Sequence, residues 1–318
     1  MTTFVTGAAG FIGSNLVDRL LGDGEVVIGY DNLSTGMPEF IASARRHRNF
    51  TFVQGDLLDT RRLAEAMSGA TRVVHFAANA DVRSGLAQPR KDLEQNTIAT
   101  FNVLEAMRSN SVREIAFSST GSIYGEAAIV PTPEDAPFPV QTSLYGASKL
   151  ACEGMITAYA EGYGIKARIF RFVSILGRRY SHGHVYDFMM QLAQNNDALH
   201  ILGDGKQRKS YLDVEDCIEA VLLALNAGDE HIAIFNLGTD EVCQVLDCVD
   251  WIAARLEVSP QLSFSGGRRG WIGDIPLIHL DTSRIRGLGW QPKRNIREAV
   301  ELTVDWLDAN RWIFAKRH

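Results

Sequence analysis

The sequence is poor in the features that mark secreted, membrane-spanning and metal-binding proteins. Its four cysteines include no C-x-x-C pair and no zinc-like spacing. No apolar run reaches the roughly 20 residues that cross a bilayer. The N-terminus enters an apolar segment at once, without a basic stretch or a cleavage site. We therefore expect a cytoplasmic protein with reduced cysteines, no metal site and no membrane partner.

The chain also lacks an excess of positive charge. Its 32 lysines and arginines are outnumbered by 38 acidic residues, which gives a formal net charge of -6. A nucleic-acid surface needs a basic patch, so no nucleic-acid partner is expected. There is no internal repeat or low-complexity tract, and 46% of the 318 residues are hydrophobic. Such a chain can bury one large α/β core or two packed units.

The first motif is a glycine-rich turn. Residues 2–6 form a short β-branched run, which leads into Gly7, Gly10 and Gly13 and then into a helix-like pattern. A strand, a glycine turn and a helix in this order are typical of dinucleotide binding, here with G-x-x-G-x-x-G spacing. Glycines let the backbone approach a pyrophosphate, and the helix N-terminus offers free N–H groups.

A second apolar run, residues 26–31, ends in an acidic residue. The carboxylate of Asp31 stands where it can accept both hydroxyls of an adenosine ribose. It would repel a 2′-phosphate, which favours NAD over NADP. The polar loop that follows, with Asn32, Ser34, Thr35 and Gly36, suits the same ribose.

Strand and helix patterns alternate along most of the chain. Further strands are expected at 50–54, 72–76, 115–120, 167–173 and 232–237, and further helices at 214–226, 240–256 and 296–309. This alternation predicts an α/β fold with a doubly wound parallel Rossmann sheet. We expect an NAD-binding domain at 1–172, to whose sheet the segment around 211–237 returns. A smaller α/β substrate domain is expected at 173–318.

One predicted helix carries a tyrosine and a lysine one turn apart. With Thr142 or Ser143 as its N-cap and Gly162 or Gly164 at its end, the helix places Tyr145 and Lys149 on one face. An ammonium and a positively charged ring near a phenol favour the phenolate, which would make the tyrosine a base near neutral pH. Taken alone, Tyr-x-x-x-Lys is also common on ordinary amphipathic helices.

Together these motifs resemble the extended short-chain dehydrogenase/reductase superfamily, in particular its NAD-dependent UDP-sugar 4-epimerases. Besides Asp31, the matching pieces are TGAAGFIG (6–13), HFAAN (75–79), SSTGSIYGE (118–126), YGASK (145–149), GDGKQRKSY (203–211) and NLGT (236–239). The similarity covers nearly the whole chain. It implies a catalytic set of Thr120, Tyr145 and Lys149, in which the tyrosine is the base and the lysine bonds the nicotinamide ribose.

The glycine turn, the acidic strand end and the resemblance together suggest the residues that contact the ligands. Expected NAD contacts are Gly7, Gly10, Phe11, Ile12, Gly13, Asp31, Asn32, Ser34, Thr35, Gly36, Asp56, Leu57, Phe76, Ala77, Ala78, Asn96, Ser118, Tyr145, Lys149 and Phe172. Expected substrate contacts are Ser119, Thr120, Ser122, Tyr145, Ser174, His184, Val185, Lys209, Tyr211, Arg269 and Asp274. Which cation holds the diphosphate is open between Arg208 and Lys209, and between Arg268 and Arg269.

The reaction that the resemblance implies is inversion at C4 of a UDP-hexose through a transient 4-keto sugar. Nucleotide-sugar 4,6-dehydratases carry Asp-Glu directly after the catalytic hydroxyl, where this chain has Gly121 and Ser122, which argues against elimination. A UDP-glucuronate decarboxylase, a 4-epimerase of a UDP-uronic acid and a catalytically silent NAD-binding regulator remain alternatives. Relatives commonly pair through the helices that match 90–109 and 143–161, so a homodimer is expected.

The substituent at C2 of the sugar depends on one further position. In the family, a residue shortly after the Gly273-Asp274 pair lines the pocket beside C2, and the matching residue here is Ile278. Because isoleucine is smaller than tyrosine, acceptance of UDP-N-acetylglucosamine is expected as well. The alternative is that Ile278 is an ordinary strand residue of the core.

Overall fold

The computed structural model describes residues 1–79, 81–138 and 140–316, and the chain forms two compact units. The first unit comprises residues 1–123, 143–171 and 221–235, and the second comprises 124–142, 172–220 and 236–318. The first unit is therefore assembled from three separate stretches of chain, because residues 124–142 belong to the second unit and a late strand returns to the sheet of the first.

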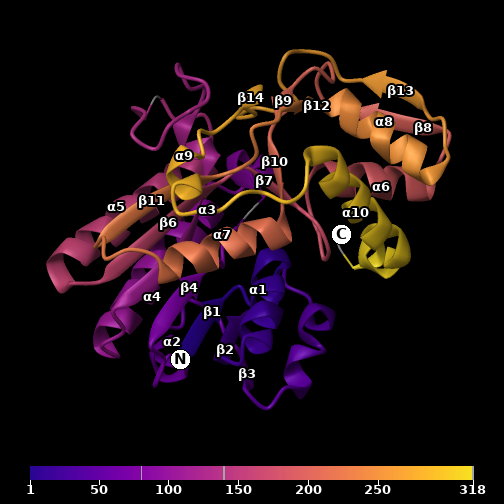
Figure 1. Cartoon of the computed structure of the whole chain (residues 1–318). Helices are drawn as coiled ribbons and strands as arrows, with labels where there is room; N and C mark the ends of the chain where they lie inside the picture. The colour runs from indigo at the N-terminus through magenta and orange to yellow at the C-terminus, as the bar shows by residue number, and fades with distance from the viewer. Residues whose placement is uncertain (80, 139, 317–318) are drawn as a thin grey trace. The chain divides into compact units, whose positions relative to one another are not determined.

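The first unit is built on a seven-stranded sheet (Figure 1). Its order is β11-β6-β5-β4-β1-β2-β3. The strands are β1 (Thr2–Thr6), β2 (Val26–Asp31), β3 (Phe50–Gln54), β4 (Arg72–His75), β5 (Glu114–Thr120), β6 (Lys166–Phe172) and β11 (Ile232–Leu237). β1 is parallel to β2 and β4, β2 to β3, and β4 to β5. The strand order reverses between β1 and β4, so the predicted doubly wound fold is confirmed.

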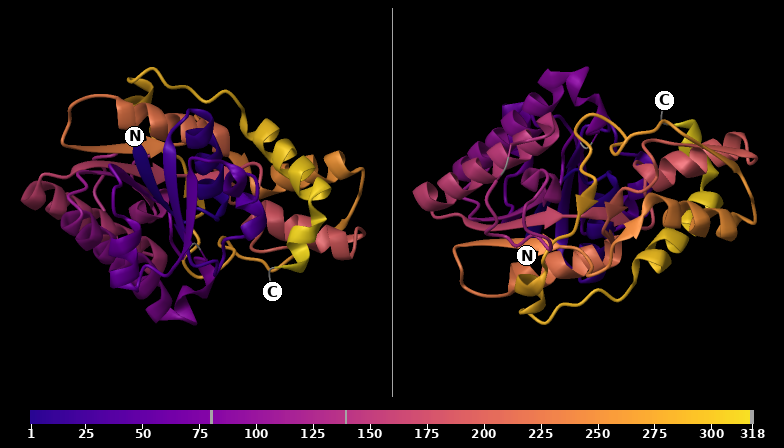
Figure 2. Two further views of the ribbon diagram at one scale, coloured as in Figure 1. Left: turned by 90° about the horizontal axis from the view of Figure 1, so that it is seen from below. Right: turned by 90° about the horizontal axis from the view of Figure 1, so that it is seen from above.

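Helices cover the faces of this sheet. The longer ones are α1 (Phe11–Gly22), α2 (Thr60–Ala66), α4 (Ala99–Ser109), α5 (Leu144–Tyr163) and the C-terminal part of α7 (Val214–Asn226). The short turns are η1 (Pro38–Ile41), η2 (Ala44–Arg46), η3 (Arg83–Leu86), α3 (Pro89–Asp92), the π-helical η4 (Leu93–Ile98) and η5 (Gly121–Tyr124). α4 and α5 pack against each other (Figure 2). Strands covered on both faces are apolar throughout, which explains the near-continuous hydrophobic runs.

Helix α5 has the ends that the sequence predicts. The side chain of Ser143 accepts a hydrogen bond from the backbone N–H of Gly146 at 3.0 Å, which satisfies one of the open donors of the first turn. The helix ends at Gly164, whose φ of 66° lies in the left-handed region that glycine adopts without strain. The cap therefore fixes the first turn, which carries Tyr145.

The second unit combines three helices with short strands. The helices α6 (His184–Gln194), α8 (Val245–Leu256) and α10 (Ile296–Ala309) pack against one another (Figure 1). The strand pairs are β7 (Ser174–Leu176) with β10 (Tyr211–Asp213), and β8 (Ala198–Ile201) with β13 (Gln261–Phe264). β9 (Arg208–Lys209) lies between β12 (Cys243–Gln244) and β14 (Leu277–Ile278). The remaining elements are α9 (Ser283–Arg286) and η6 (Arg311–Ala315).

The helix expected at 240–256 begins later than predicted. Gln244 and Asp247 form a capping box, in which each side chain bonds the other residue's backbone N–H, so the helix starts at Val245. Cys243 and Gln244 pair with β9 as a strand instead. The helix-like sequence pattern extends to the N-terminal side of the cap, so the predicted start of the helix was too early. Within the described residues, no helix is long and apolar enough to cross a membrane.

Candidate functional site

The glycine turn lies at the point where the strand order of the sheet reverses. Gly7 has a φ of 70°, and a β-carbon there would come within 2.7 Å of the backbone nitrogen of Ala77. A β-carbon on Gly13 would lie 2.0 Å from the carbonyl oxygen of Gly7. The N-cap of α1, Gly10, makes no side-chain cap. A tight turn with open N–H groups at a helix N-terminus is chemically suited to a pyrophosphate.

Asp31 closes the next strand with a buried carboxylate. Its Oδ2 accepts the N–H of Ala9 at 2.9 Å, and its Oδ1 accepts the N–H of Leu33 at 2.7 Å. Burial raises the pKa of Asp31, and the two backbone donors oppose that rise. A β-carbon on Gly36 would lie 2.8 Å from Oδ1, so glycine keeps the approach to the carboxylate open. Each oxygen retains a lone pair for a ribose hydroxyl, which fits an adenosine without a 2′-phosphate.

A hollow of about 430 Å³ lies beside this strand end. From the expected cofactor set it is lined by Asn32, Ser34 and Asp56, and the amide of Asn32 donates to Asp56 at 2.9 Å. Its other wall is made by Gln88, Pro89, Arg90, Lys91, Glu94 and Gln95, none of which the sequence singled out. The volume is in the range of a small-molecule site.

The expected catalytic residues come together at the end of β5 and the start of α5. Thr120 is the last residue of β5 and forms a hydrogen bond with Tyr145. Lys149 is only 2% exposed, donates from Nζ to the carbonyl of Ser118 at 2.7 Å and lies 4.6 Å from the ring centroid of Phe117. The alternation of β5 and the one-turn spacing of α5 thus place the hydroxyl, the phenol and the ammonium in one region of the first unit.

The phenol of Tyr145 is held in its protonated form by its surroundings. Burial raises its pKa to about 12, the hydrogen bond with Thr120 lowers it, and the charge of Asp92 raises it further. Burial also lowers the pKa of Lys149 to about 8, although the neighbouring Glu153 opposes that shift. The protein's own groups therefore do not make Tyr145 a phenolate at neutral pH. That a positively charged nicotinamide does so stays a prediction.

Ser119 is a residue of β5 with a buried side chain. Its hydroxyl donates to Glu153, whose carboxylate pairs with Arg171 at 2.7 Å, and all three side chains are buried. Successive strand residues point to opposite faces, so Ser119 points away from the face that carries Ser118 and Thr120. The Ser119 side chain therefore belongs to a buried polar network beneath α5, and its expected substrate contact stays a prediction. The alternation of β5 was a signal for this orientation.

Several other expected contacts have buried side chains. Asn96 is 2% exposed, its side-chain carbonyl accepts the backbone N–H of Asn79, and its amide donates to the hydroxyl of Ser148. Its contact with NAD stays a prediction. Val185 is fully buried in α6, which leaves only its backbone for a ligand. Phe11, Leu57, Ser118 and Phe172 are buried, Ile12, Phe76, Ala77, Ala78 and Ser122 are half-buried, and Thr35 is exposed.

The second unit brings part of the expected substrate set together. His184 opens α6, and its ring centroid lies 5.0 Å from that of Tyr211. The buried Nε2 of His184 has no hydrogen-bond partner among the described residues. Burial and the charge of Lys209 lower the pKa of His184 to about 3. Ser174, exposed on β7, pairs in register with Tyr211.

The cations of this set already have anionic partners. Lys209 donates to Asp274 at 2.7 Å, whereas its neighbour Arg208 is exposed. Arg268 and Arg269 both pair with Glu126, the former at 3.2 Å. Glu126 closes the SSTGSIYGE motif, and no local pattern predicts that it pairs with a loop some 140 residues later. The arrangement can exchange these carboxylates for a diphosphate.

Ile278 lies in β14, where it pairs in register with Lys209. It is a strand residue, but a half-buried one rather than a residue of the core, and it lies on the strand next to the one that carries the expected substrate cation. Whether its side chain limits the C2 substituent stays a prediction.

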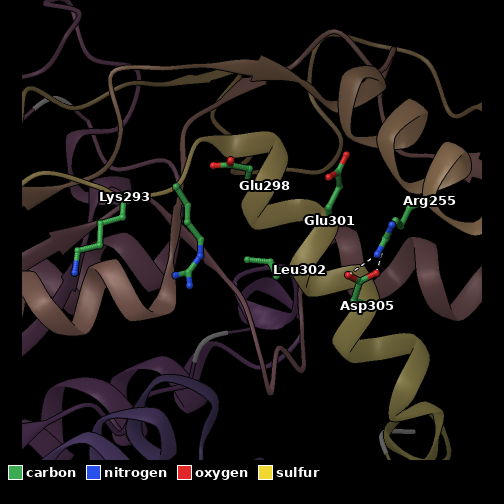
Figure 3. A pocket seen from close by; sticks show the side chains of 7 residues that line it. Arg255, Lys293, Glu298, Glu301, Leu302 and Asp305 are labelled. Atoms are coloured by element: carbon green, nitrogen blue, oxygen red, sulfur yellow. Dashed lines mark hydrogen bonds and ion pairs between the residues drawn. The ribbon is translucent and has the colours of Figure 1, made fainter.

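A second hollow, of about 360 Å³, lies over α8 and α10 (Figure 3). Its charged side chains already have partners. Arg255 pairs with Asp305 at 2.6 Å, Arg294 with Asp213 at 2.7 Å, and Lys293 with Glu219 at 2.7 Å. Glu298 caps α10, and Glu301 pairs with Arg297. This hollow therefore offers a ligand little unpaired charge.

Residues 3–238 match the model of the NAD dependent epimerase/dehydratase family. A UDP-glucose 4-epimerase of Mycolicibacterium smegmatis is 34% identical over 316 residues, which cover 96% of this chain and 98% of that protein. The structure of a UDP-glucose 4-epimerase with UDP-glucose from Thermotoga maritima gives a TM-score of 0.88 at 31% identity. That of a Bacillus cereus UDP-glucuronic acid 4-epimerase, in complex with UDP-glucuronic acid and NAD, gives 0.90 at 26% identity. Each comparison covers 98% of this chain and 100% of the other.

Proposed function

Because this chain belongs to the NAD dependent epimerase/dehydratase family, we propose that it is an NAD-dependent enzyme that inverts C4 of a UDP-hexose. The observation that carries the proposal is the arrangement of Thr120, Tyr145 and Lys149 at the carboxyl end of β5. A hydroxyl, a phenol and an ammonium in this order are the groups that a reversible oxidation of a sugar hydroxyl needs. The substitution of Gly121 and Ser122 for an acidic pair supports epimerisation over elimination.

The first unit supplies the residues that would hold NAD. The turn from Gly7 to Gly13 fits the pyrophosphate, and Asp31 with Asn32 fits the adenosine ribose. When bound, NAD would supply the hydride chemistry, the reversible removal of a hydride from C4 of the sugar. The protein contributes binding, orientation and proton transfer.

Tyr145 moves the proton in this reaction. As a phenolate it removes the proton of the C4 hydroxyl when the carbon is oxidised, and it returns that proton when the inverted alcohol forms. Thr120 bonds the phenol and directs it toward the reacting oxygen. Lys149 holds its ammonium beside the end of β5, where its charge favours the ionised tyrosine. The proton is conserved over the cycle, so no external acid or base is required.

The second unit supplies the residues for the nucleotide. Lys209 and one or both of Arg268 and Arg269 would exchange Asp274 and Glu126 for diphosphate oxygens, through charge-assisted hydrogen bonds. His184 and Tyr211 add a polar ring pair at the N-terminus of α6. We assign NAD binding to the first unit and UDP-sugar binding to the second.

We also propose a cytoplasmic homodimer that pairs through α4 and α5. These helices and the adjoining η4 carry exposed apolar side chains, including Leu93, Ile98, Phe101 and Tyr163. Phe101 is 44% exposed and meets the ring of Tyr159 edge-on, so an aromatic patch spans the two helices. Apolar residues gathered on one helical face are typical of a subunit interface.

The test is incubation of the NAD-loaded protein with single sugars, followed by anomer-resolved NMR. UDP-glucose and UDP-galactose are expected to interconvert, with UDP-N-acetylglucosamine as an additional and slower substrate. UDP-glucuronate serves as the comparison: its conversion to a pentose nucleotide would indicate a decarboxylase, and its conversion to a 4-epimer a uronic-acid epimerase. The Tyr145→Phe variant is the matched control. A flat progress curve with every sugar would support the regulator and overturn the proposal.

A further inference from the structure

A cluster of buried polar side chains lies against the first turns of α5. It consists of Asn79, Asp92, Asn96 and Ser148, which we call the Asp92 cluster, and the members are between 1% and 7% exposed. Apart from Asn96, none was expected in the site, and the proposed mechanism uses none of them. Burial of polar groups lowers the stability of the folded state unless each group is hydrogen-bonded, so a buried polar cluster with an unsatisfied atom indicates a functional role.

Hydrogen bonds join the cluster into one network. Oδ1 of Asp92 accepts from the amides of Asn79 at 2.8 Å and of Asn96 at 3.4 Å. The carbonyl of the Asn96 side chain accepts the backbone N–H of Asn79 at 2.8 Å. Its amide donates to the hydroxyl of Ser148 at 2.9 Å. The network thus connects α3 and η4 to the helix that carries Tyr145.

Asp92 itself is only partly satisfied. Its Oδ2 is buried and has no hydrogen-bond partner among the described residues. A β-carbon on Gly85 would lie 2.9 Å from this oxygen, so a glycine leaves room for the carboxylate but offers it no donor. A buried carboxylate that lacks half of its bonds is unfavourable for stability, which points to a role other than packing.

Two routes link the cluster to Tyr145. The hydroxyl of Ser148 donates to the carbonyl of Tyr145 at 2.8 Å, so the network restrains the backbone of the turn that holds the phenol. The carboxylate of Asp92 also acts on the phenol through its charge. One route is mechanical and the other electrostatic, and both end at the same residue.

From this geometry we propose that Asp92 is a positioning residue, which anchors the Tyr145 turn through Asn96 and Ser148 and places a negative charge close to that turn, since the β-carbon position of Gly85 lies 2.9 Å from its Oδ2 and 3.7 Å from Cβ of Leu144. The inference rests on the proposed function, because it concerns the base of that reaction. Burial raises the pKa of the phenol, and the charge of Asp92 adds to that effect, so the phenol is protonated in the free enzyme. Ionisation then depends on the positive charge that arrives with the cofactor, so the base forms only where it is used.

The sign of the effect follows from the groups around the two side chains. Those acting on Tyr145 are Thr120 on β5, Asp92 on α3 and Cys152 on α5, and those acting on Asp92 are Asn79, Lys91 and Asp81. A negative charge near a phenol opposes its ionisation. Removing that charge therefore lowers the pKa of Tyr145, and the acid limb of the activity profile moves to lower pH.

The deciding variant is Asp92→Asn, which keeps the shape and the acceptor oxygen but removes the charge. Titration of the NAD-loaded protein by its phenolate ultraviolet difference spectrum, with the Tyr145→Phe spectrum subtracted, reports Tyr145 directly. We expect its pKa to fall by roughly one unit. In the Tyr145→Phe background, Asp92→Asn is expected to change nothing. An unchanged pKa, or an equal change in both backgrounds, would overturn the proposal.

Measurement of kcat tests the mechanical role of Asp92 separately from its electrostatic role. We expect Asp92→Ala, which removes the anchor, to lower kcat about tenfold with KM for UDP-glucose within about twofold, since only the base is displaced. Asp92→Asn is expected to retain more activity. Glu65→Gln, which removes an exposed carboxylate from α2, is the matched control and is expected to match the wild type. Equal kcat in Asp92→Ala and the wild type would rule out the anchoring role. A wild type without epimerase activity would overturn the proposed function, while the titration still tests the electrostatic role.

Discussion

Tyr145 is the residue on which the proposed chemistry depends, because it takes the proton of the C4 hydroxyl and returns it. Tyr145→Phe is expected to lower kcat by about 10²- to 10⁴-fold, the usual contribution of a positioned general base. KM is expected to change little, because the substrate loses only one hydrogen bond and keeps its other contacts. Thr120→Val, which leaves the base in place, is the graded control and should cost less. Steady-state kinetics with UDP-galactose checks this, and near-wild-type turnover in Tyr145→Phe would refute the assignment.

Lys149 governs the pH dependence. The base must be ionised, so activity is expected to rise with pH through the pKa of Tyr145 in the NAD-bound enzyme. The pKa of Lys149 is lowered to about 8, so its ammonium loses its charge as the pH rises through that value. Lys149→Ala removes the charge at every pH, and the acid limb is expected to move to higher pH. Profiles of kcat for the two proteins test this. A limb that stays in place, or moves to lower pH, would show that Lys149 does not favour the phenolate.

At the scale of elements, the N-cap of α5 ties stability to catalysis. Ser143→Ala removes the bond to the N–H of Gly146 and is expected to lower the free energy of unfolding by about 1 kcal/mol. Because Tyr145 lies in the first turn, kcat is expected to fall as well. Ser143→Asp, which restores a cap, should recover both. Asn295→Ala removes the equivalent cap of α10 and should cost similar stability without the loss of kcat. Urea denaturation and kinetics on the same samples separate the two effects.

The elements that local patterns describe well are those that carry their own start and stop signals. The range of β11, the limits of α7 and α10 and both ends of α5 agree with the sequence predictions. Side-chain directions agreed less well. Ser119 and Val185 were assigned to ligands by resemblance; their side chains are buried on β5 and α6, and their ligand contacts stay predictions. The partners of Ser119 and Arg269 are distant in sequence, and no local pattern predicts them. For Asp92 the spacing to Asn96 put both on one helical face, which was a usable signal.

For the whole molecule, binding of NAD is expected to appear as stability. A ligand that binds the folded state alone adds about 2.7 kcal/mol at 100 times its Kd. We expect NAD to be released when the purified protein is denatured, and added NAD to raise Tm more than an equal concentration of NADP. The control is Asp31→Ala, in which the preference for NAD should weaken because the carboxylate no longer repels the 2′-phosphate. Retention of NADP by the wild-type protein would contradict the role of Asp31.

The quaternary prediction concerns the aromatic patch on α4 and α5. Phe101→Asp places a charge in the proposed interface and is expected to convert the dimer into monomers, which light scattering after size exclusion measures. The matched control is Phe264→Asp, because Phe264 on β13 is 45% exposed but lies in the second unit. It should leave the mass unchanged. A monomeric wild-type protein would contradict the proposed dimer, and a dimeric Phe101→Asp variant would contradict an interface on α4 and α5.

The discontinuous first unit has a consequence for how the protein is made. A ribosome releases β1 to β6 early, but β11, the edge strand beside β6, emerges only after residues 172–220 of the second unit have been synthesised. Until then β6 is an open edge with unpaired backbone groups, a template for pairing with a neighbouring nascent chain. The nascent chain is therefore most prone to aggregate while the ribosome translates residues 172–237. Slower translation over that stretch should increase aggregation rather than relieve it.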